Sequence, residues 1–406
     1  MNYLILGSSA AGVNAAKELR DLNQDANITI ASKDKQLFSR CILHHLIEGK
    51  RDESQLHFLG PDVLNTHNIN FLGDYVAKSI DTDSKTVSFE NGEELTYDKL
   101  LIATGSSSFI PPVENLREAK QVIGLRDLED AQRIKASIKD GMSVAVIGSG
   151  LVGMDVLEAL TTYNVKIHLV DLAPRLLSLQ LDDVTSQTYL DAAMKYDVTP
   201  HFNTLAKLVH VDSDNNVVAL ELDNGDKFDC DLIVCSAGTR SNIGFLEGSN
   251  IETWERGLKF DNFGRTNVED VYGAGDVSGV HPIWPMAVKE GIVAASNMSG
   301  IEKEMKDHFA FRATMNFFGI PTMSVGLLKE EDGTEFKILN KDGVYRKIAI
   351  RDNKVVGAIL QGDIGYGGIL IQLIKKEYDI SHLMNKIFDL DYSDFFNLKE
   401  DKQFDI

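Results

Sequence analysis

The sequence predicts an α/β fold with two Rossmann-like dinucleotide-binding domains and a small α+β C-terminal domain. Two segments about 140 residues apart share one plan, in which a β-rich run passes through a glycine-rich turn into a helix rich in alanine and leucine: NYLILGSSAAGVNAAKEL at the start and MSVAVIGSGLVGMDVLEAL from Met142. Each segment continues into a second strand, NITIASKD or KIHLVDLAP. This pattern is the opening βαβ unit of a dinucleotide-binding fold, and it occurs twice.

Length and charge limit the class of protein. The chain has 406 residues, which is too long for one ordinary core, so several domains are expected. It carries 41 basic and 61 acidic residues, a net charge of −20, which argues against nucleic acid or an anionic membrane as a partner. The sequence has no run of 18 apolar residues and no signal peptide at its start, so we expect a cytoplasmic protein.

The three cysteines are too few and too irregularly spaced for a disulfide framework or a zinc site, so no metal is expected. Cys230 and Cys235 lie in KFDCDLIVCSAG, an apolar run that predicts a buried strand, and we expect them to be core thiols. Cys41 differs because of its neighbours, which are considered below.

The first glycine turn has the residues that a phosphate-binding turn requires. Gly7 permits the tight passage from strand to helix, and Gly12 allows the helix to pack closely on the strand. The middle position is Ser9, a small residue instead of glycine. The N–H groups at the start of the following helix would then face the phosphates of a nucleotide.

The second turn matches the full pattern through Gly148, Gly150 and Gly153. At the end of its second strand stands Asp171, which is placed to accept hydrogen bonds from ribose hydroxyls and to repel a 2′-phosphate. The second site is therefore predicted to prefer NADH, while the nearby Arg175 leaves NADPH open. The first copy has Ser32 at its corresponding end, a weaker partner for a ribose.

Further motifs follow in order: YDKLLIATGSSSFIPP from Tyr97, GSGLVG, DLIVCSAGTRSN, and TNVEDVYGAGDVSG from Thr266. With the first βαβ unit, this series resembles the two-dinucleotide flavoprotein reductases of the pyridine nucleotide–disulfide oxidoreductase superfamily. The resemblance implies FAD in the first site, NADH in the second, and hydride transfer from NADH to the flavin. It also implies that Asp276 contacts the ribityl chain of FAD and that Asp155 replaces a glutamate found near the nicotinamide in many relatives.

The resemblance implies a division of the chain and two sets of binding residues. Residues 1–117 and 236–305 would form the FAD domain, 118–235 the NAD domain inserted between them, and 306–406 the C-terminal α+β domain. The expected FAD residues are Gly7, Ser9, Ala10, Ala11, Gly12, Ser32, Lys33, Arg40, Val76, Thr104, Gly105 and Asp276. The expected NAD residues are Gly148, Gly150, Leu151, Val152, Gly153, Asp171 and Gly238.

The C-terminal region contains RKIAIRDNKVVGAILQGDIG, which predicts two strands joined by a turn at residues 352–354, and then GGILIQLIKKEYDI, which predicts an amphipathic helix. This short domain resembles that of NADH:rubredoxin reductases and of the flavoprotein portion of nitrite reductases. The segment that contains Trp284 and Pro285 is similar to the same group, and the tryptophan is expected either beside the flavin or as plain packing.

The segment FSRCILHHLIEG places Cys41 after Arg40, at the head of a predicted short helix. NADH oxidases, peroxidases and coenzyme A disulfide reductases have a redox-active cysteine near this position. Arg40 and the helix N-terminus would favour the thiolate of Cys41. Against a redox role, Ala10 stands where those enzymes have a histidine. His44 or His45 could reach the sulfur from the same helix and take that place, but a polar helix face or a packing histidine is the favoured interpretation.

Three functions follow from these observations. The first is an NADH-dependent, FAD-containing reductase that passes electrons to a small redox protein such as rubredoxin. The second is a thiol-dependent NADH oxidase, peroxidase or coenzyme A disulfide reductase that uses Cys41 on a low-molecular-weight acceptor. The third is a non-catalytic nucleotide-binding sensor. The sequence is compatible with a monomer or a homodimer.

Overall fold

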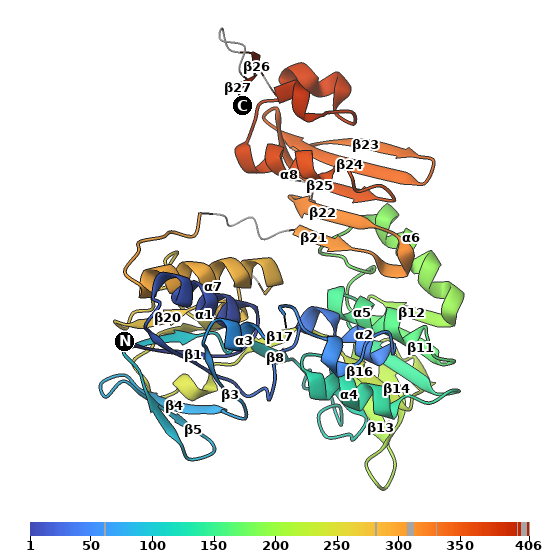
Figure 1. Cartoon of the computed structure of the whole chain (residues 1–406). Helices are drawn as coiled ribbons and strands as arrows, with labels where there is room; N and C mark the ends of the chain where they lie inside the picture. Colours follow the sequence, from blue (N-terminus) through green and yellow to red (C-terminus); the bar gives the residue numbers. More distant parts are fainter. Residues whose placement is uncertain are drawn as a thin grey trace.

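The structure is a computed structural model that describes residues 1–60, 62–280, 282–306, 312–329, 331–395, 397–398 and 404–405. Three lobes are visible in Figure 1: two α/β lobes side by side, and a C-terminal lobe over the second of them. Among the described residues, none of the helices combines the length and apolar character that crossing a membrane requires.

The first lobe is built on a parallel sheet. The strand order is β20 (Val271–Gly273), β7 (Lys99–Ile102), β1 (Asn2–Leu6), β2 (Asn27–Ala31) and β3 (Asn70–Leu72). One face, with Tyr3 and Ile5, packs on helices α1 (Ala10–Leu22) and α7 (Trp284–Met298). The other face, with Leu4 and Leu6, packs on the antiparallel strands β4 (Ala77–Asp81), β5 (Thr86–Phe89) and β6 (Glu94–Thr96). The alternation of faces follows from the two-residue period of a strand.

The second lobe repeats this plan. Its parallel sheet has the order β12 (Val198–Phe202), β11 (Lys166–Asp171), β10 (Ser143–Ile147), β16 (Leu232–Cys235) and β9 (Val122–Gly124). Val144 and Val146 face a core that includes α4 (Leu128–Ser137), α5 (Leu151–Leu160) and α6 (Asp183–Ala193). Ala145 and Ile147 face β13 (Ala206–Val211) and β14 (Val217–Leu222), which continue into β15 (Lys227–Asp229). The predicted pair of Rossmann-like domains is confirmed.

Two short strands connect these lobes. Strands β8 (Ser106–Ser108) and β17 (Thr239–Ser241) pair antiparallel between the two sheets, so the chain leaves and re-enters the first lobe along one ribbon (Figure 1). After β17 come the hairpin β18 (Thr253–Trp254) and β19 (Gly257–Leu258), and then β20, which pairs with β7. The first sheet therefore contains four strands that precede the second lobe in the sequence and one strand, β20, that follows it.

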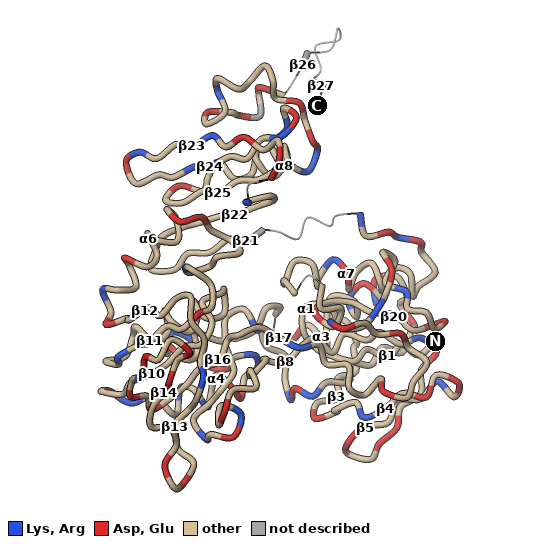
Figure 2. Tube along the Cα trace, turned by 180° about the vertical axis from the view of Figure 1, so that it is seen from behind, with Lys and Arg blue, Asp and Glu red and all other residues tan. Residues whose placement is uncertain are grey.

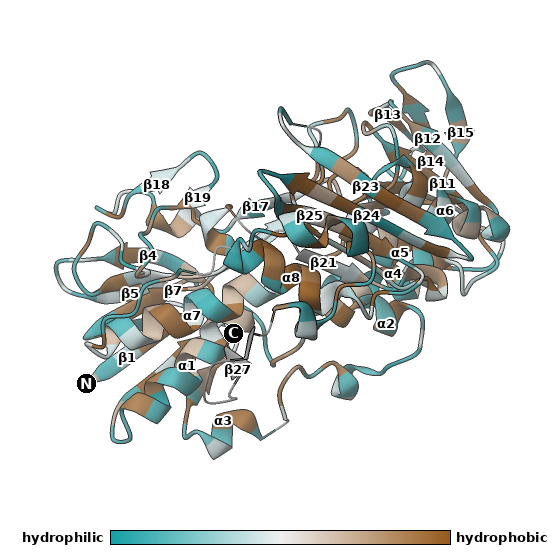
Figure 3. Cartoon of the chain, turned by 90° about the horizontal axis from the view of Figure 1, so that it is seen from above, coloured by the Kyte–Doolittle hydropathy of each residue, from teal (hydrophilic) through white to brown (hydrophobic). Residues whose placement is uncertain are grey.

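The C-terminal lobe is an antiparallel sheet with one helix. Its strand order is β21 (Arg312–Met315), β22 (Thr322–Gly326), β25 (Lys354–Gln361), β24 (Val344–Arg351) and β23 (Glu335–Lys341). The predicted pair of strands is β24 and β25, and the predicted helix is α8 (Gly367–Lys376), so both are confirmed. Their apolar residues pack together, and Figure 3 shows hydrophobic stretches on α8 and on these strands. The sequence did not reveal β21, β22 and β23.

Short elements complete the described fold. The short helices are α2 (His44–Ile47) and α3 (Val63–Thr66), and the last strands are β26 (Asn397–Leu398) and β27 (Phe404–Asp405). The 3₁₀ turns are Arg40–Ile42, Glu53–Gln55, Met194–Tyr196, Gly244–Leu246, Asp276–Ser278, Phe317–Gly319, Ser381–Lys386 and Tyr392–Phe395.

The C-terminal lobe is held on the second lobe by buried polar contacts. The hydroxyl of Tyr189 on α6 donates to the Ile320 carbonyl at 2.8 Å and lies 2.7 Å from the Thr322 hydroxyl. Asp182, which caps α6, accepts a hydrogen bond from the Tyr345 hydroxyl at 2.5 Å. Because buried polar groups need partners, these contacts fix the position of the C-terminal lobe relative to α6.

The Tyr189→Phe substitution tests this attachment. The Tyr189 side chain is fully buried. Removing its hydroxyl takes away the hydrogen bond that it donates to the Ile320 carbonyl. We expect a fall of about 1–3 kcal/mol in the free energy of unfolding, measured by chemical denaturation. The control is Tyr196→Phe, at a half-exposed ring that stacks on Phe318, where little change is expected. Equal stability of the two variants would contradict the assignment.

Candidate functional site

The first glycine turn is fixed by contacts that exclude a side chain. Gly7 has a φ of +112°, and a Cβ there would lie 2.2 Å from the Ala103 carbonyl oxygen. A Cβ on Gly12 would lie 1.9 Å from the Gly7 carbonyl oxygen. Helix α1 follows from Ala10, with Ser9 at its N-cap making no capping bond through its side chain. The turn therefore presents its first N–H groups at the carboxyl end of β1.

The second turn repeats these contacts. Gly148 has a φ of +103°, and a Cβ on Gly153 would lie 1.9 Å from the Gly148 carbonyl oxygen. Gly150 is the N-cap of α5, and a Cβ there would meet nothing within 4 Å. Since Gly148 and Gly153 are required by packing, whereas Gly150 faces open space, the middle glycine leaves room for a close ligand.

A cavity of about 1390 Å³ lies between the lobes. Its wall takes residues from the first turn, from α5 of the second lobe and from the C-terminal lobe. The expected site residues on this wall are Gly7, Ser9, Ala10, Ala11, Ser32, Lys33, Arg40, Cys41, Val76, Thr104, Gly105, Leu151, Val152 and Asp276. The expected residues that are not on this wall are Gly12, Gly148, Gly150, Gly153, Asp171 and Gly238.

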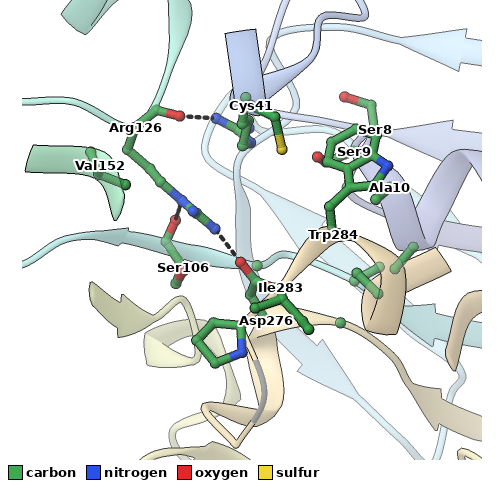
Figure 4. Close-up of a pocket in the computed structure, with 18 of the residues that line it drawn as sticks. Ser8, Ser9, Ala10, Cys41, Ser106, Arg126, Val152, Asp276, Ile283 and Trp284 are labelled. Atoms are coloured by element: carbon green, nitrogen blue, oxygen red, sulfur yellow. Dashed lines mark hydrogen bonds and ion pairs between the residues drawn. The ribbon is translucent and has the colours of Figure 1, made fainter. Parts of the chain in front are cut away.

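A charged chain runs along one wall of the cavity, and Figure 4 shows part of it. Arg40 pairs with Asp34 at 2.5 Å and donates to the Arg126 carbonyl at 2.8 Å. Arg126 in turn pairs with Asp276 at 2.5 Å and donates from Nε to the Ser106 carbonyl at 3.0 Å. The burial of Asp34 raises the pKa of its carboxyl, although Arg40 opposes the shift.

Arg126 was missed by the sequence analysis. It directly precedes Asp127, the N-cap of α4, whose carboxylate accepts a hydrogen bond from the Asp130 N–H at 3.1 Å. Asp–x–x–Asp before an apolar-periodic run is a helix-start signal, and it would have placed Arg126 in the loop before a helix. Its contact with Asp276 joins residues 150 positions apart, which no local pattern indicates.

The carboxylate of Asp171 is held by the second glycine turn. Its Oδ2 accepts hydrogen bonds from the N–H and the hydroxyl of Ser149, both at 2.6 Å, and its Oδ1 accepts from the Ala173 N–H at 2.8 Å. Arg175 is directed elsewhere, because it pairs with Asp183 at 3.1 Å and donates to the Leu181 carbonyl. The Asp171 carboxylate is thus held in place, and the Arg175 guanidinium is engaged by Asp183 and the Leu181 carbonyl.

Cys41 lies in the cavity, but its surroundings differ from those predicted. Its side chain is exposed, and in Figure 4 its sulfur lies between Arg126 and Trp284. The segment is a 3₁₀ turn instead of the start of a regular helix, and Arg40 is occupied by Asp34. Partial burial of the thiol disfavours its charged form, and the negative charge of Asp155 adds to this effect. Together they raise the pKa of the thiol to about 11. The expectation that Arg40 and a helix N-terminus favour the thiolate was wrong.

The two histidines begin α2 and have separate partners. His44 Nδ1 lies 3.6 Å from the Asp155 carboxylate on α5, so this contact joins the two nucleotide lobes. Burial, followed by the neighbouring His45, lowers the pKa of His44 to about 4, and its ring is neutral at pH 7. His45 Nδ1 lies 3.1 Å from the Glu48 carboxylate. His44 thus lines the cavity with Cys41, while its Nδ1 atom faces Asp155.

The remaining walls come from α7 and from the C-terminal lobe. Trp284 and Pro285 line the cavity, and the Trp284 ring also packs edge-on against Phe58 with centroids 4.8 Å apart. Met315 and Phe317 line it from the C-terminal lobe. The sequence analysis did not include these two residues, because their place depends on how separate lobes pack.

Two parallel sheets, each with a phosphate-binding type of turn, and a cavity lined by the first turn and by the start of α5, define a protein that binds two dinucleotides. The family model "Pyridine nucleotide-disulphide oxidoreductase" matches residues 1–291, and "Rubredoxin NAD+ reductase C-terminal domain" matches residues 313–378. The chain therefore belongs to the pyridine nucleotide-disulphide oxidoreductase family. It is an FAD-dependent NAD(P)H oxidoreductase.

Known proteins with a similar chain include two curated relatives. Nitrite reductase [NAD(P)H] of Bacillus subtilis is 28% identical over 390 residues, covering 93% of this chain and 48% of that protein. The epsilon subunit of NADH-dependent phenylglyoxylate dehydrogenase of Aromatoleum evansii is 27% identical over 403 residues, covering 95% and 94%. The chain thus spans about half of the first relative and nearly all of the second.

Among solved structures, the NAD-dependent persulfide reductase from A. fulgidus superimposes with a TM-score of 0.86 and 25% identity. The match covers 97% of this chain and 80% of that chain. The wall residues fit the family's flavin, because the cavity is large and the backbone around Gly7 and Gly12 leaves no side chain over the first turn.

The raised pKa of Cys41 predicts a specific pH dependence. Since the neutral thiol is favoured below a pKa of about 11, alkylation by iodoacetamide should accelerate roughly tenfold per pH unit between pH 7 and pH 10. Cys230 and Cys235 are buried and should stay unmodified. Mass spectrometry of the intact protein gives the rate, with Cys41→Ser as the blank. A rate that levels off below pH 8 would show that the thiolate is favoured after all.

Asp171→Asn tests the choice of nicotinamide cofactor. The substitution removes the charge that repels a 2′-phosphate and weakens charge-assisted hydrogen bonds, which are worth about 1.5–3 kcal/mol. We expect kcat/KM for NADH to fall roughly 10- to 100-fold and the NADPH-to-NADH ratio to rise, measured with ferricyanide as acceptor. Asp191→Asn, at an exposed carboxylate of α6 whose partner is Gln187, is the matched control. An unchanged ratio in Asp171→Asn would remove the residue from nucleotide selection.

Proposed function

We propose that the protein takes hydride from NADH through its FAD and passes the electrons to a small redox protein. The observation that carries the proposal is the shared cavity, whose wall includes the first glycine turn and also Leu151, Val152 and Asp155 at the start of α5. Because α5 begins directly after Gly150 of the second turn, the two nucleotide sites would meet at this cavity. This arrangement brings two reactants together and orients them.

The roles of the residues follow from their positions. The first turn, with Ser32 and Asp276, would hold FAD, and the second turn, with Gly150 and Asp171, would hold NADH. When bound, FAD supplies the capacity to accept a hydride and to release electrons singly. The chain contributes the N–H groups for the phosphates, the fixed carboxylate of Asp171, and walls that limit access of water.

The C-terminal domain and the local charge support a redox-protein acceptor. The match of residues 313–378 is to the C-terminal domain of rubredoxin NAD+ reductase. Although the net charge is −20, Lys33, Lys50, Lys289 and Lys375 line the cavity. Acidic and basic residues are spread over all three lobes in Figure 2, whereas the cavity wall has six lysines and arginines against four acidic residues. This local excess of positive charge would guide an acidic carrier to the cavity.

A second candidate is a thiol-dependent reductase that uses Cys41. Its support is the exposed sulfur on the cavity wall and the similarity to a persulfide reductase. Its weakness is chemical, since the thiol has a raised pKa and Ala10 supplies no acid or base. The other two cysteines are buried, so Cys41 has no accessible thiol partner within the chain.

Anaerobic titration of the FAD-loaded protein separates these functions. If Cys41 is inert, NADH should bleach the flavin with about two electrons per chain, and Cys41→Ser should behave identically. Purified rubredoxin should then reoxidise the reduced protein faster than oxygen or a low-molecular-weight persulfide does. The rate with rubredoxin should fall as salt is raised, because salt screens the lysines.

The control for the titration is Cys230→Ala, which removes a buried thiol of the second lobe. It should leave the electron count unchanged. Uptake of about two further electrons in the wild type, lost only in Cys41→Ser, would establish the thiol enzyme instead. Failure of NADH to reduce the flavin would leave a nucleotide-binding sensor and refute both enzymatic proposals.

A further inference from the structure

Three potential metal ligands gather on and just after α2, beside the cavity. One ligand atom from each of His44, His45 and Glu48 lies within 4.8 Å of the other two. The spacing explains the cluster, because residues three and four apart share a face of a helix, and Glu48 stands at those distances from the two histidines.

Glu48 has an oxygen without a partner. Its side chain is 0% exposed, yet only Oε2 is used, by His45 Nδ1 at 3.1 Å and by Lys50 Nζ at 2.8 Å. Oε1 is buried and accepts no hydrogen bond in the described part of the chain. A buried carboxylate oxygen without a donor is costly, and a bound cation would satisfy it.

Asp155 provides a second, independent observation. Its Oδ1 lies 3.6 Å from His44 Nδ1, and it comes from α5 of the other nucleotide lobe. Histidines that bind metals usually give their second ring nitrogen to a carboxylate, which fixes the ring and its tautomer. At 3.6 Å the His44 Nδ1 atom faces Asp155 without a hydrogen bond to it, and the Nε2 atom of His44 is left for a ligand. Glu158 also lines the cavity and adds negative charge nearby.

We propose that His44, His45 and Glu48 bind a divalent cation of the zinc type. Two imidazoles and one carboxylate are a ligand set that suits zinc and leaves a fourth position open. Magnesium and calcium prefer oxygen ligands and fit the set poorly. The Lys50 side chain is 57% exposed, so its ammonium is free to turn away when the cation enters. Through Asp155, the bound cation would hold α2 against α5.

The test is calorimetric titration of chelator-treated, FAD-loaded protein with zinc chloride. We expect about one zinc ion per chain, and a loss of affinity of at least tenfold in Glu48→Gln and in His44→Gln. Asp155→Asn should weaken binding by about ten- to a hundredfold, as expected for a carboxylate that orients a ligand. Flavin content and the unfolding midpoint without zinc identify any variant that fails to fold, and His45→Asn then replaces it.

A matched control comes from another pair in the chain. His210 Nε2 lies 3.1 Å from the Glu221 carboxylate, the same chemistry and distance as His45 and Glu48, but without a third ligand in the part of the chain described. His210→Gln and Cys41→Ser should both keep the wild-type affinity. The proposal is overturned if the wild type binds no zinc, if Glu48→Gln binds as tightly as the wild type, or if Cys41→Ser abolishes binding.

Discussion

The close approach of helix and strand at each glycine turn sets the rest of the architecture. At Gly12 and at Gly153 a Cβ would lie 1.9 Å from a carbonyl oxygen of the same turn. The helix can therefore begin directly at the carboxyl end of the first strand, with its unpaired N–H groups exposed there. Because this happens in both lobes, each sheet presents a ligand-binding edge, as expected for open parallel sheets. The first turn and the start of α5 then share one cavity between the lobes.

The segment that contains Cys41 and α2 belongs to the first lobe but packs on the second. Its residues join the core of the second lobe, and the Tyr163 hydroxyl donates to the Ile47 carbonyl. The interface between the first and second lobes thus holds Cys41 and His44, which face Asp155 on α5. Burial at this interface, and then the Asp155 carboxylate on its other side, raise the pKa of the Cys41 thiol.

How far the sequence predicted this molecule depends on the range of the interactions. The two βαβ units were predictable because each turn is determined by neighbours such as Gly148 and Gly153. The Arg126–Asp276 pair was not, since it joins residues from different lobes. The same limit explains why the pKa of Cys41 was mispredicted. Arg40 is its neighbour in sequence but pairs with Asp34, and the surroundings of the sulfur are set by residues distant in sequence. Strands β21 to β23 carried too weak an alternation to be recognised.

The two turns differ in the residue at the end of the second strand, where a nucleotide's ribose would lie. Gly7 N–H donates to the Ala31 carbonyl as Gly148 N–H donates to the Val170 carbonyl, so the next residues, Ser32 and Asp171, correspond. In the first lobe the Ser8 and Ser32 hydroxyls lie 2.8 Å apart, a neutral pair. In the second, the corresponding Ser149 hydroxyl donates to the Asp171 carboxylate, which is held in place. A fixed negative charge discriminates against a 2′-phosphate, whereas a hydroxyl pair does not. Under the proposed assignment of NADH to the second turn, selection between nicotinamide cofactors would belong to the second lobe.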